Sequence, residues 1–575
     1  MTLILGLAAP GFAADQLELQ VHGLEGELLA NVRAAVTPPV GLIRDGRLDR
    51  PWLERFRRQV PGLVRAALVP YGYFDPTVEV KIQESGGGKA LLAVEVAAGK
   101  PVRVATVQLV LKGPGREEPQ LRSMLATFPL QVGAVLRQEV YEAGKGALKS
   151  RAIDLGYLDA TYVVHQLAVS RVDLRADIHL ELETGPLYFF GPTLIHGDVD
   201  YPDAFLRRYL AFRRGERFAY PLLGQTQINL LDSDRFKDVL ITPQRDLPTG
   251  QEVPIGIQLI PSERRRLRPG IGYGTDTGVR GSLRYQDVNL FHLGHELKVE
   301  TGLSQVKKTL GADYLVPSPT ALDNLTALHG SFDRENTDTY TSSKISVELE
   351  RIHRLNSIAL GSLFVRLQRE DYQVGLSDSR SKMVIPGVRL TLRDLSDLIR
   401  PRSGYRLNLE VRGSHPALAS DTELLQVLGD ANLLLPLPWR LSLLGRSSWG
   451  WTLQSDPLAE IPASLRFFAG GDQSVRGYSY RSLGPRDASG EVVGGKQLAT
   501  GSLELERAIG SDWGVACFYD TGNAFNSLND LQWAQAAGIG VRYYTLIGPL
   551  RFDLARRVGE ETGAYRVHIS VGFVW

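Results

Sequence analysis

The sequence predicts three small α+β repeats followed by a 16-stranded antiparallel transmembrane β-barrel. Three observations predict this fold. Segments of about 80 residues share one plan in the N-terminal half, alternation of apolar and polar residues replaces that plan from about Leu267, and the chain stops on an alternating segment that ends in Trp575. The predicted divisions are a segment similar to a secretory signal at 1–14, repeats at 15–98, 99–185 and 186–265, and a barrel at 266–575.

Composition restricts the class of protein. The chain has 575 residues, of which 43% are hydrophobic and 22% charged, which is typical of folded domains and too long for one of them. A formal net charge of +1 gives no reason to expect nucleic acid as a partner. Because Cys517 is the one cysteine, neither an internal disulfide nor a thiolate metal cluster can form.

The first residues indicate export. Residues 2–9 are apolar, and Gly11 and Ala13 supply small residues of the kind that a signal peptidase recognises. The positive region that normally precedes such a segment is missing, since the first basic residue is Arg33, so we expect a clipped or misassigned start. Beyond this segment no run of 18 uncharged apolar residues occurs, so no helical membrane span is expected.

Each repeat is predicted to contain one strand, two helices and then two strands, enough to bury one sheet face under helices. In the first repeat Leu53, Phe56 and Val64 recur at helical spacing, and Pro61 is expected to kink or split that helix. Two sets of anchors favour a true repeat over three unrelated α+β domains. The first set consists of Phe74, Leu158 and Phe236, which follow one another at steps of 84 and 78 residues. The second set consists of Gly99 and Gly185, which lie 86 residues apart.

The repeats carry no sign of catalysis. Their histidines, His165, His179 and His196, lack the spacing of metal ligands, and no nucleophile, base and orienting group recur together on one loop cluster. We therefore expect binding or scaffolding modules whose sheet edges can pair with an extended partner segment. The protein is expected not to be an enzyme and to need no cofactor.

The C-terminal half alternates apolar positions with fully charged ones. Clear examples are residues 345–350, 405–412, 439–443, 550–554 and 565–575. A soluble β-sandwich would expose the charges to bulk water, whereas a membrane barrel would place the apolar face in lipid and the charges in a wet lumen. Aromatic residues bracket strands of about ten residues, and the barrel region divides into sixteen strands of roughly nineteen residues with their turns. We therefore favour the barrel.

One stretch within the barrel region has neither a strand nor a helix period. Residues 467–480 contain three glycines, and a single cation, Arg476, lies between Val475 and Gly477. Alone, such a tetrapeptide is most simply a surface turn with a solvated arginine. In the middle of a wide barrel it becomes a candidate for an inward loop, which we predict at 454–495.

Together these features resemble the outer-membrane assembly factors with POTRA repeats, over nearly the whole chain after residue 15. The features are three α+β repeats, a β-barrel, a Val-Arg-Gly-Tyr loop before the last five strands and an aromatic C-terminus. In that superfamily BamA has five repeats and two-partner secretion transporters have two. Three repeats before sixteen strands look most like the TamA branch, the outer-membrane subunit of the translocation and assembly module.

The resemblance also implies roles for particular residues. The lumen-loop motif of the family is matched by Val475, Arg476, Gly477 and Tyr478, its Phe-x-Asp-x-Gly strand motif by Phe518, Asp520 and Gly522, and its acidic position on the preceding strand by Glu504. Strand parity agrees, since Glu504 alternates with Leu503 and Leu505. Asp520 shares the parity of Ala516 and Phe518, opposite Val515, Cys517 and Tyr519. Both carboxylates should then face the lumen, where Arg476 can bind one or both. Parity alone does not distinguish these two carboxylates from the many other charges that are expected in the lumen.

The function that the resemblance implies is assembly of other proteins in the outer membrane of a Gram-negative bacterium, with the repeats in the periplasm. The implied partners are a TamB-like inner-membrane-anchored periplasmic protein, autotransporter-type clients and the lipid bilayer, and no nucleic acid. Phospholipid movement along the TamB-like partner is a further implied possibility. The alternatives are a two-partner-secretion-type pore for a dedicated exoprotein, a BamA-like general insertase, and a passive porin, against which the repeats and the inward loop argue.

Two junctions carry further predictions. The run 263–268 holds four arginines and is expected to be a linker, either at the inner-leaflet head groups or simply solvated. The first barrel strand is predicted at 269–278. Because glycine weakens a strand and proline cannot donate to a ladder, we expect the seam between the first and last strands to have the fewest ladder bonds and to open for a client strand. The residues concerned are Gly270, Gly272, Gly274, Gly572, Phe573 and Trp575.

Overall fold

A computed structural model describes most of the chain. The described residues are 16–39, 41–44, 47–85, 89–197, 200–246, 250–319, 321–375, 377–397, 402–454, 457–545, 548–559 and 564–571. The predicted signal segment 1–14 and the predicted seam residues Gly572, Phe573 and Trp575 lie outside them. Two compact units result, one of residues 1–196, 211–227 and 240–258, the other of residues 197–210, 228–239 and 259–575. Within the described ranges, no helix is both long and apolar enough to cross a membrane.

The first repeat packs two helices on a three-stranded sheet. Its elements are β1 (Gln16–His22), α1 (Gly26–Ala35), β2 (Ile43–Arg44), β3 (Arg47–Leu48), α2 (Arg50–Leu68), β4 (Thr77–Ser85) and β5 (Lys89–Ala97), with sheet order β1-β5-β4. Strand β1 runs parallel to β5, and β4 antiparallel to it. The helix does not split at Pro61. Its neighbours Val60 and Val64 are fully buried in the core, and this packing holds one continuous helix although proline removes a hydrogen bond.

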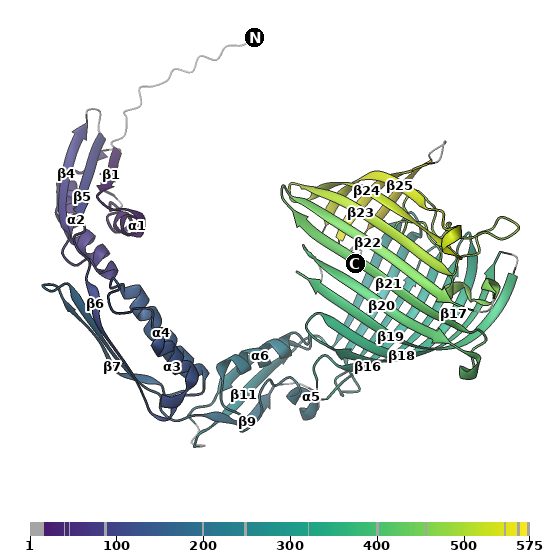
Figure 1. Ribbon diagram of the computed structural model, residues 1–575, viewed down its shortest axis with the longest axis horizontal. Coiled ribbons are helices and arrows are strands. Elements are labelled where there is room, and N and C mark those ends of the chain that lie inside the picture. The colour runs from purple at the N-terminus through teal and green to yellow at the C-terminus, as the bar shows by residue number, and fades with distance from the viewer. Residues whose placement is uncertain are drawn as a thin grey trace, which may run out of the picture. The chain divides into compact units, whose positions relative to one another are not determined.

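The second repeat has the same plan, and Figure 1 shows its helices along one face of its sheet. Its elements are β6 (Arg103–Lys112), α3 (Pro119–Ala126), α4 (Gln138–Asp154), β7 (Thr161–Ser170) and β8 (Arg175–Glu183), with sheet order β6-β8-β7. Helix α4 ends in a glycine cap, because Gly156 adopts a φ of 90° and the Tyr157 amide donates to the Ala152 carbonyl. Leu148 and Ile178 lie in its buried core.

The third repeat comprises β9 (Phe189–His196), α5 (Asp203–Arg207), α6 (Tyr220–Leu231), β10 (Phe236–Pro243) and β11 (Glu252–Pro261), with sheet order β10-β11-β9. The predicted plan of one strand, two helices and two strands is therefore confirmed three times. Helix α5 belongs to the same compact unit as the barrel. Arg208 donates to the carbonyl oxygens of Ala321 and Leu322 at 3.0 and 2.8 Å, and Gly294 lies so close to Phe205 that a Cβ there would come within 2.4 Å of the ring.

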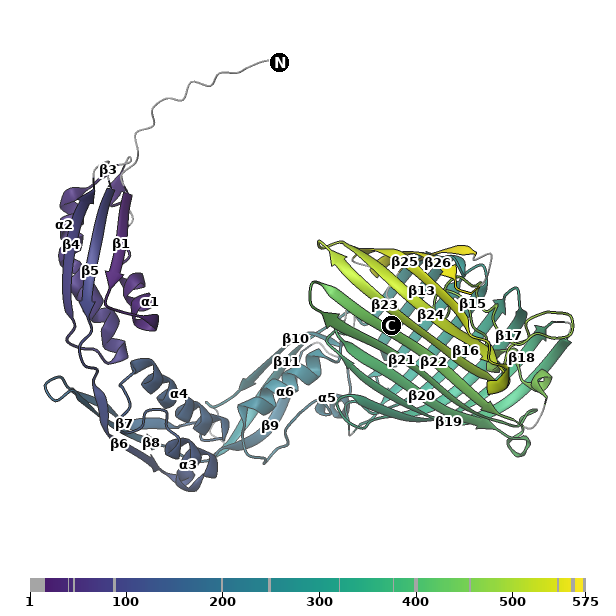
Figure 2. The ribbon, with the colours of Figure 1, turned by 45° about the horizontal axis from the view of Figure 1, so that its top comes forward.

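The C-terminal region is a closed barrel of sixteen strands in sequential order, with antiparallel neighbours, as predicted (Figure 2). The strands are β12 (Arg265–Gly274), β13 (Gly278–Leu290), β14 (His295–Leu303), β15 (Lys307–Pro317), β16 (Leu325–Asn336), β17 (Tyr340–Arg354), β18 (Ala359–Val374), β19 (Ser377–Leu395), β20 (Gly404–Ser414), β21 (Leu424–Leu437), β22 (Leu441–Leu453), β23 (Gln497–Ile509), β24 (Trp513–Phe525), β25 (Ala534–Thr545), β26 (Gly548–Arg557) and β27 (Tyr565–Val571).

The two faces of the barrel wall differ as a membrane barrel requires. Outward side chains such as Leu503, Val515 and Ile539 are apolar and exposed. Inward side chains form ion networks, in which Arg389 contacts Glu348, Glu350 and Glu410 at 2.6, 2.9 and 2.7 Å. An apolar outer face with charges inside is the reverse of a soluble sandwich.

Two predictions at strand ends are wrong. The arginine run is not a linker, because β12 already begins at Arg265 and pairs it with Asp287 of β13. The buried Asp287 carboxylate accepts from both Arg264 and Arg265 at 2.9 and 3.2 Å, which fixes the run against the barrel wall. Trp439 and Arg440, assigned above to a strand, form the turn between β21 and β22 with φ of 62° and 60°.

Candidate functional site

The connection between β22 and β23 lies inside the barrel. We call its described residues 457–496 the lumen loop. It contains the 3-10 turns Leu458–Glu460 and Ala463–Leu465. On one side of the wall Tyr480 donates to Glu335 of β16 at 3.1 Å, and the Ser464 amide donates to Glu370 of β18 at 3.0 Å. A segment that bonds to these strands and also to β24–β27 has to cross the lumen.

Arg476 is the centre of the loop's contacts. Its Nε and Nη2 donate to the two oxygens of Asp520 at 2.7 and 2.9 Å, and its backbone amide donates to the same carboxylate at 3.0 Å. Nη1 donates to Glu504 at 2.8 Å and to Asp553 at 3.1 Å. The guanidinium lies 3.4 Å from the ring centroid of Phe518. Such forked and stacked contacts suit arginine and not lysine, whose ammonium is a point charge.

The remaining residues of the two motifs surround this contact. Val475 and Tyr478 pack with Ala536 in one buried cluster. The Gly477 carbonyl accepts from Arg557 of β26 at 3.0 Å. Gly522 lets β24 approach β23 closely, because a Cβ there would lie 2.6 Å from the Ala499 carbonyl oxygen. The structure thus places both motifs in one lumen cluster.

The sequence analysis missed two members of this cluster. Arg542, 1% exposed, donates to Asp553 at 2.5 Å and to Glu504 at 2.6 Å. Gly540 leaves the room for this, since a Cβ there would lie 1.9 Å from an Asp553 oxygen. Strand parity alone could have placed Asp553 on the lumen side, because it alternates with Phe552 and the other lipid-facing positions of β26. Parity could not show which cation would contact Asp553.

The seam between β12 and β27 has the shortest ladder in the described part of the barrel. It consists of one residue pair, Gly274 with Ser570, whereas the next shortest ladder, β26–β27, has seven. The Thr275 amide adds one bond to the Ile569 carbonyl at 3.1 Å. Gly270 and Gly272 lie on the part of β12 that has no partner among the described residues of β27. A groove of about 410 Å³ lies beside this edge, lined in part by Gly270, Gly272 and Val571.

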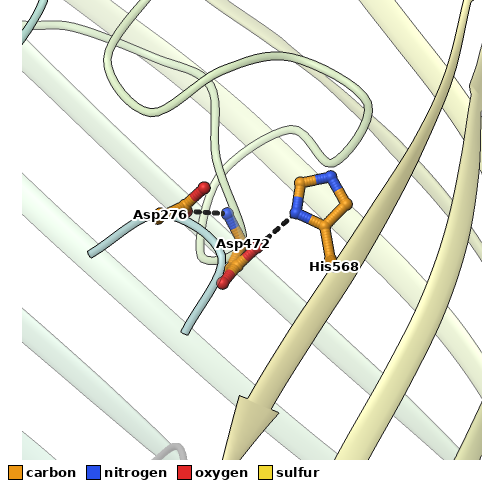
Figure 3. A group of neighbouring side chains, drawn as sticks. All are labelled: Asp276, Asp472 and His568. Atoms are coloured by element: carbon orange, nitrogen blue, oxygen red, sulfur yellow. Dashed lines mark hydrogen bonds and ion pairs between the residues drawn. The ribbon is translucent and has the colours of Figure 1, made fainter. Parts of the chain in front are cut away.

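A polar group of three side chains connects the lumen loop to this seam (Figure 3). His568 of β27 contacts Asp472 of the loop through Nδ1, and the Asp472 amide donates to Asp276, in the turn after β12, at 2.6 Å. The Gly477 amide donates to Nε2 of His568 at 2.9 Å. Burial, and then the Asp472 carboxylate, raise the pKa of Asp276 above its ordinary value.

Asp276, Asp472 and His568 lie close enough together to suggest a metal site, but their hydrogen bonds argue against one. An amide can only donate, so Nε2 of His568 is the acceptor and the ring proton is on Nδ1, from which it is donated to Asp472. Neither ring nitrogen therefore has a free lone pair for a cation. The group is a hydrogen-bonded bridge.

Family models match both halves of the chain. A model described as the Omp85 superfamily domain matches residues 289–575, and one described as POTRA domain TamA domain 1 matches residues 18–98. The outer membrane protein assembly factor BamA of Nitratidesulfovibrio vulgaris is 22% identical over 410 residues, which are 67% of this chain and 51% of that protein. The chain thus spans about half the length of this relative.

Two further comparisons cover very different shares of the chain. The sorting and assembly machinery component 50 homolog of Mus musculus is 35% identical over 112 residues, 19% of this chain and 22% of that protein. The crystal structure of BamA from Haemophilus ducreyi lacking POTRA domains 1–3 covers 82% of this chain and 99% of its own, with a TM-score of 0.69 and 15% identity. This likeness shows that the fold is the same.

Proposed function

The chain belongs to the Omp85 superfamily, with a barrel in the outer membrane of a Gram-negative bacterium and POTRA repeats in the periplasm, and we propose that it assembles other outer-membrane proteins through its seam. The clients are autotransporter-type proteins. A TamB-like periplasmic protein, bound by the repeats, is the partner. The proposal assigns no catalytic step to the chain.

The observation that carries the proposal is the weakness of the seam. A single ladder pair joins β12 to the described part of β27. The main-chain groups of β12 from Arg265 to Tyr273 face a side with no described partner strand, and this edge is a template for an incoming strand. Recognition through main-chain groups does not depend on the client's side chains, as an assembly factor with several clients requires.

The outer face beside this edge suits a strand that is entering lipid. Leu267, Ile271 and Tyr273 of β12 are exposed on the apolar side of the wall. A client strand paired with β12 continues this apolar surface, and its own polar groups are satisfied by the ladder. Both conditions have to be met before a strand enters the hydrocarbon region.

A cross-link across the seam tests the proposal. Gly274→Cys and Ser570→Cys, in a Cys517→Ser background, place two thiols on the cross-strand pair that the described residues of the seam form. A Cβ at Gly274 meets only side-chain ends, at 3.2 Å or more, so the change is tolerated. We expect a disulfide that abolishes surface display of an autotransporter client until a reductant is added.

The matched control joins an ordinary pair of strands. Ser331 of β16 and Ser346 of β17 are cross-strand partners whose hydroxyl oxygens lie 2.9 Å apart. A disulfide between Ser331→Cys and Ser346→Cys should leave client display unchanged. Undiminished display with a fully oxidised seam would rule out the proposed route.

The periplasmic partner is tested separately. The match of residues 18–98 to a TamA POTRA model supports a TamB-like protein over other partners. Affinity capture of the full chain from membranes should recover a long, β-rich periplasmic protein, and deletion of residues 16–97 should lose it. Recovery of a secreted β-helical exoprotein instead would favour a two-partner-secretion pore.

A further inference from the structure

Asp472 of the lumen loop contacts both sides of the seam. On the β27 side its carboxylate accepts from Nδ1 of His568. On the β12 side the same carboxylate accepts from the Thr275 hydroxyl at 3.3 Å, and the Asp472 amide donates to Asp276 at 2.6 Å. One loop residue therefore joins the first strand's turn to the last strand, next to the one ladder pair found among the described residues of the seam.

The register of the seam explains why a bridge is needed there. Gly274 lies opposite Ser570, so two residues further along the same antiparallel register His568 lies opposite Asp276. By then β12 has ended and the chain is in the turn towards β13. The Ile569 amide donates to the Thr275 hydroxyl at 3.3 Å instead of to a ladder carbonyl. The described part of β27 thus extends past the end of its partner, and the loop supplies the contacts that a ladder would make.

The bridge is rigidly connected to the Arg476 contact. Gly471 donates to the Val475 carbonyl at 3.2 Å and Ser474 to the Gly471 carbonyl at 3.1 Å, so the segment from Gly471 to Val475 is a tight turn. Gly471 has a φ of 105°, and a Cβ there would lie 2.5 Å from an Asp276 oxygen, so a glycine is needed for the loop to come this close. Asp472 is held on one side by this turn and on the other by the Gly477 bond to His568.

We propose that Asp472 is a strap that keeps the seam closed, and that the seam opens when its bridge to His568 and Asp276 is released. Only the purpose of the opening, the entry of a client strand, rests on the proposed function. Closure itself is a property of the barrel. The Arg476 contact holds the strap in place, so the loop motif and the seam are structurally coupled.

Hydrogen exchange on the full chain in lipid nanodiscs tests the strap without any client. The amides of Thr275 and Ile569 are direct reporters, because each donates across the seam. Asp472→Ala removes the carboxylate and keeps the backbone amide. Since a hydrogen bond to a charged group contributes roughly a tenfold to hundredfold factor, we expect exchange in peptides covering 265–275 and 564–571 to rise about tenfold or more.

The matched control is the neighbouring loop residue. Gln473 contacts Arg446 of β22 at 3.0 Å, away from the seam. Gln473→Ala should leave seam exchange unchanged, and peptides of β18 should exchange at the wild-type rate in both variants. Equal seam exchange in wild type and Asp472→Ala would overturn the proposal.

Two substitutions of His568 separate the strap from general damage to β27. Asn places its polar group near Nδ1 and can still donate to Asp472, whereas Gln places its polar group near Nε2 and keeps the Gly477 contact. We expect His568→Gln to open the seam and His568→Asn to leave it closed. The reverse order would contradict the strap. If Asp472→Ala does not fold, as judged by migration of the unheated barrel in gels, this pair decides the question.

Client display then distinguishes this inference from the proposed function. Faster seam exchange with normal display in Asp472→Ala supports the strap, and it contradicts the idea that seam closure limits assembly. Unchanged exchange contradicts the strap whatever happens to display. Faster exchange together with altered display supports both.

Discussion

The wall formed by β17, β18 and β19 and the seam between β12 and β27 hold neighbouring strands together in different ways. In the wall, ladders of fifteen and sixteen residue pairs join successive strands. At the seam one pair is present among the described residues, and contacts from the lumen loop are added to it. Backbone hydrogen bonds join the strands of the wall over their whole length, whereas the described part of the seam combines a short ladder with contacts from the lumen loop.

This difference determines where single substitutions matter. A side chain in the wall acts beside a long ladder, and its lumen charges have several partners: Glu348 binds Arg366 as well as Arg389, and Glu350 also binds His329. Asp520, by contrast, has Arg476 as its one cationic partner among the described ion pairs. We therefore expect charge removal to have large effects near the loop and small ones in the wall.

Arg476→Ala should have the largest effect. It leaves Glu504, Asp520 and Asp553 close together without the cation that they share, a loss that approaches about 3–5 kcal/mol in a dry site and less where lumen water enters. We expect normal membrane insertion, loss of client display, and new protease cleavage within residues 457–496. Arg476→Lys should have an effect intermediate between wild type and Arg476→Ala, because lysine keeps the positive charge but cannot make the forked contact. Full activity in both Arg476→Ala and Asp520→Ala would remove the basis for this ranking.

Gly538→Ala should come next. A Cβ at Gly538 would lie 2.3 Å from the Leu554 carbonyl oxygen and 2.3 Å from the Phe518 ring, the ring that stacks on Arg476. Overpacking of this kind costs roughly 1–3 kcal/mol, and we expect a lower urea midpoint and a looser loop in proteolysis. Gly501 of β23 has nothing within 4 Å of its would-be Cβ, so Gly501→Ala is the control. Equal destabilisation by the two would show that loss of strand glycine, and not the Phe518 contact, is responsible.

Arg389→Ala tests the wall. Glu348, Glu350 and Glu410 each keep another cation or histidine after the change. We expect a loss of about 1 kcal/mol or less, as for partly solvated pairs, with unchanged exchange in β17–β19 and normal client display. A loss as large as that of Arg476→Ala would mean that wall and seam do not differ in the way described.

Lys112→Ala, in the second repeat, should have the smallest effect. The Lys112 hydrogen bond lowers the pKa of the partly exposed Glu181 carboxylate, with a further contribution from His179. A lowered pKa contributes stability above the unfolded pKa, and the contribution disappears as pH falls through the folded value. We expect the variant to match wild type at acidic pH and to differ slightly at neutral pH. An NMR titration should show the pKa of Glu181 rising in the variant.

Strand parity and the family motifs together were enough to place Glu504 and Asp520 on the lumen side. Parity says which face a side chain occupies but not which residues of non-adjacent strands meet, so the contact of Arg542 with Glu504, two strands away, could not be predicted. Asp472 was missed for a related reason. Its partners depend on the path of a loop without any period, and a lone aspartate that follows two glycines has many possible positions.

The misplaced arginine run shows another limit. Arg265, Arg266 and Arg268 surround a single apolar residue, Leu267, and a strand with so many charges is read from sequence as a linker. In a barrel the polar face lines water and accepts charge, and the buried Asp287 binds two of the arginines of this run. Charge density therefore does not separate a lumen strand from a solvated connection.

The strap also has a consequence for how the barrel forms. Every other ladder of the barrel joins consecutive strands, whereas the seam joins residues 294 apart, as Thr275 and Ile569 show. Asp472 lies between them in the chain, 196 residues from Asp276 and 96 from His568. Long-range contacts form late and slowly during folding. The strap divides one very long chain loop, from the first strand to the last, into two shorter loops. We therefore expect the first and last strands to pair only after the lumen loop has docked inside the barrel.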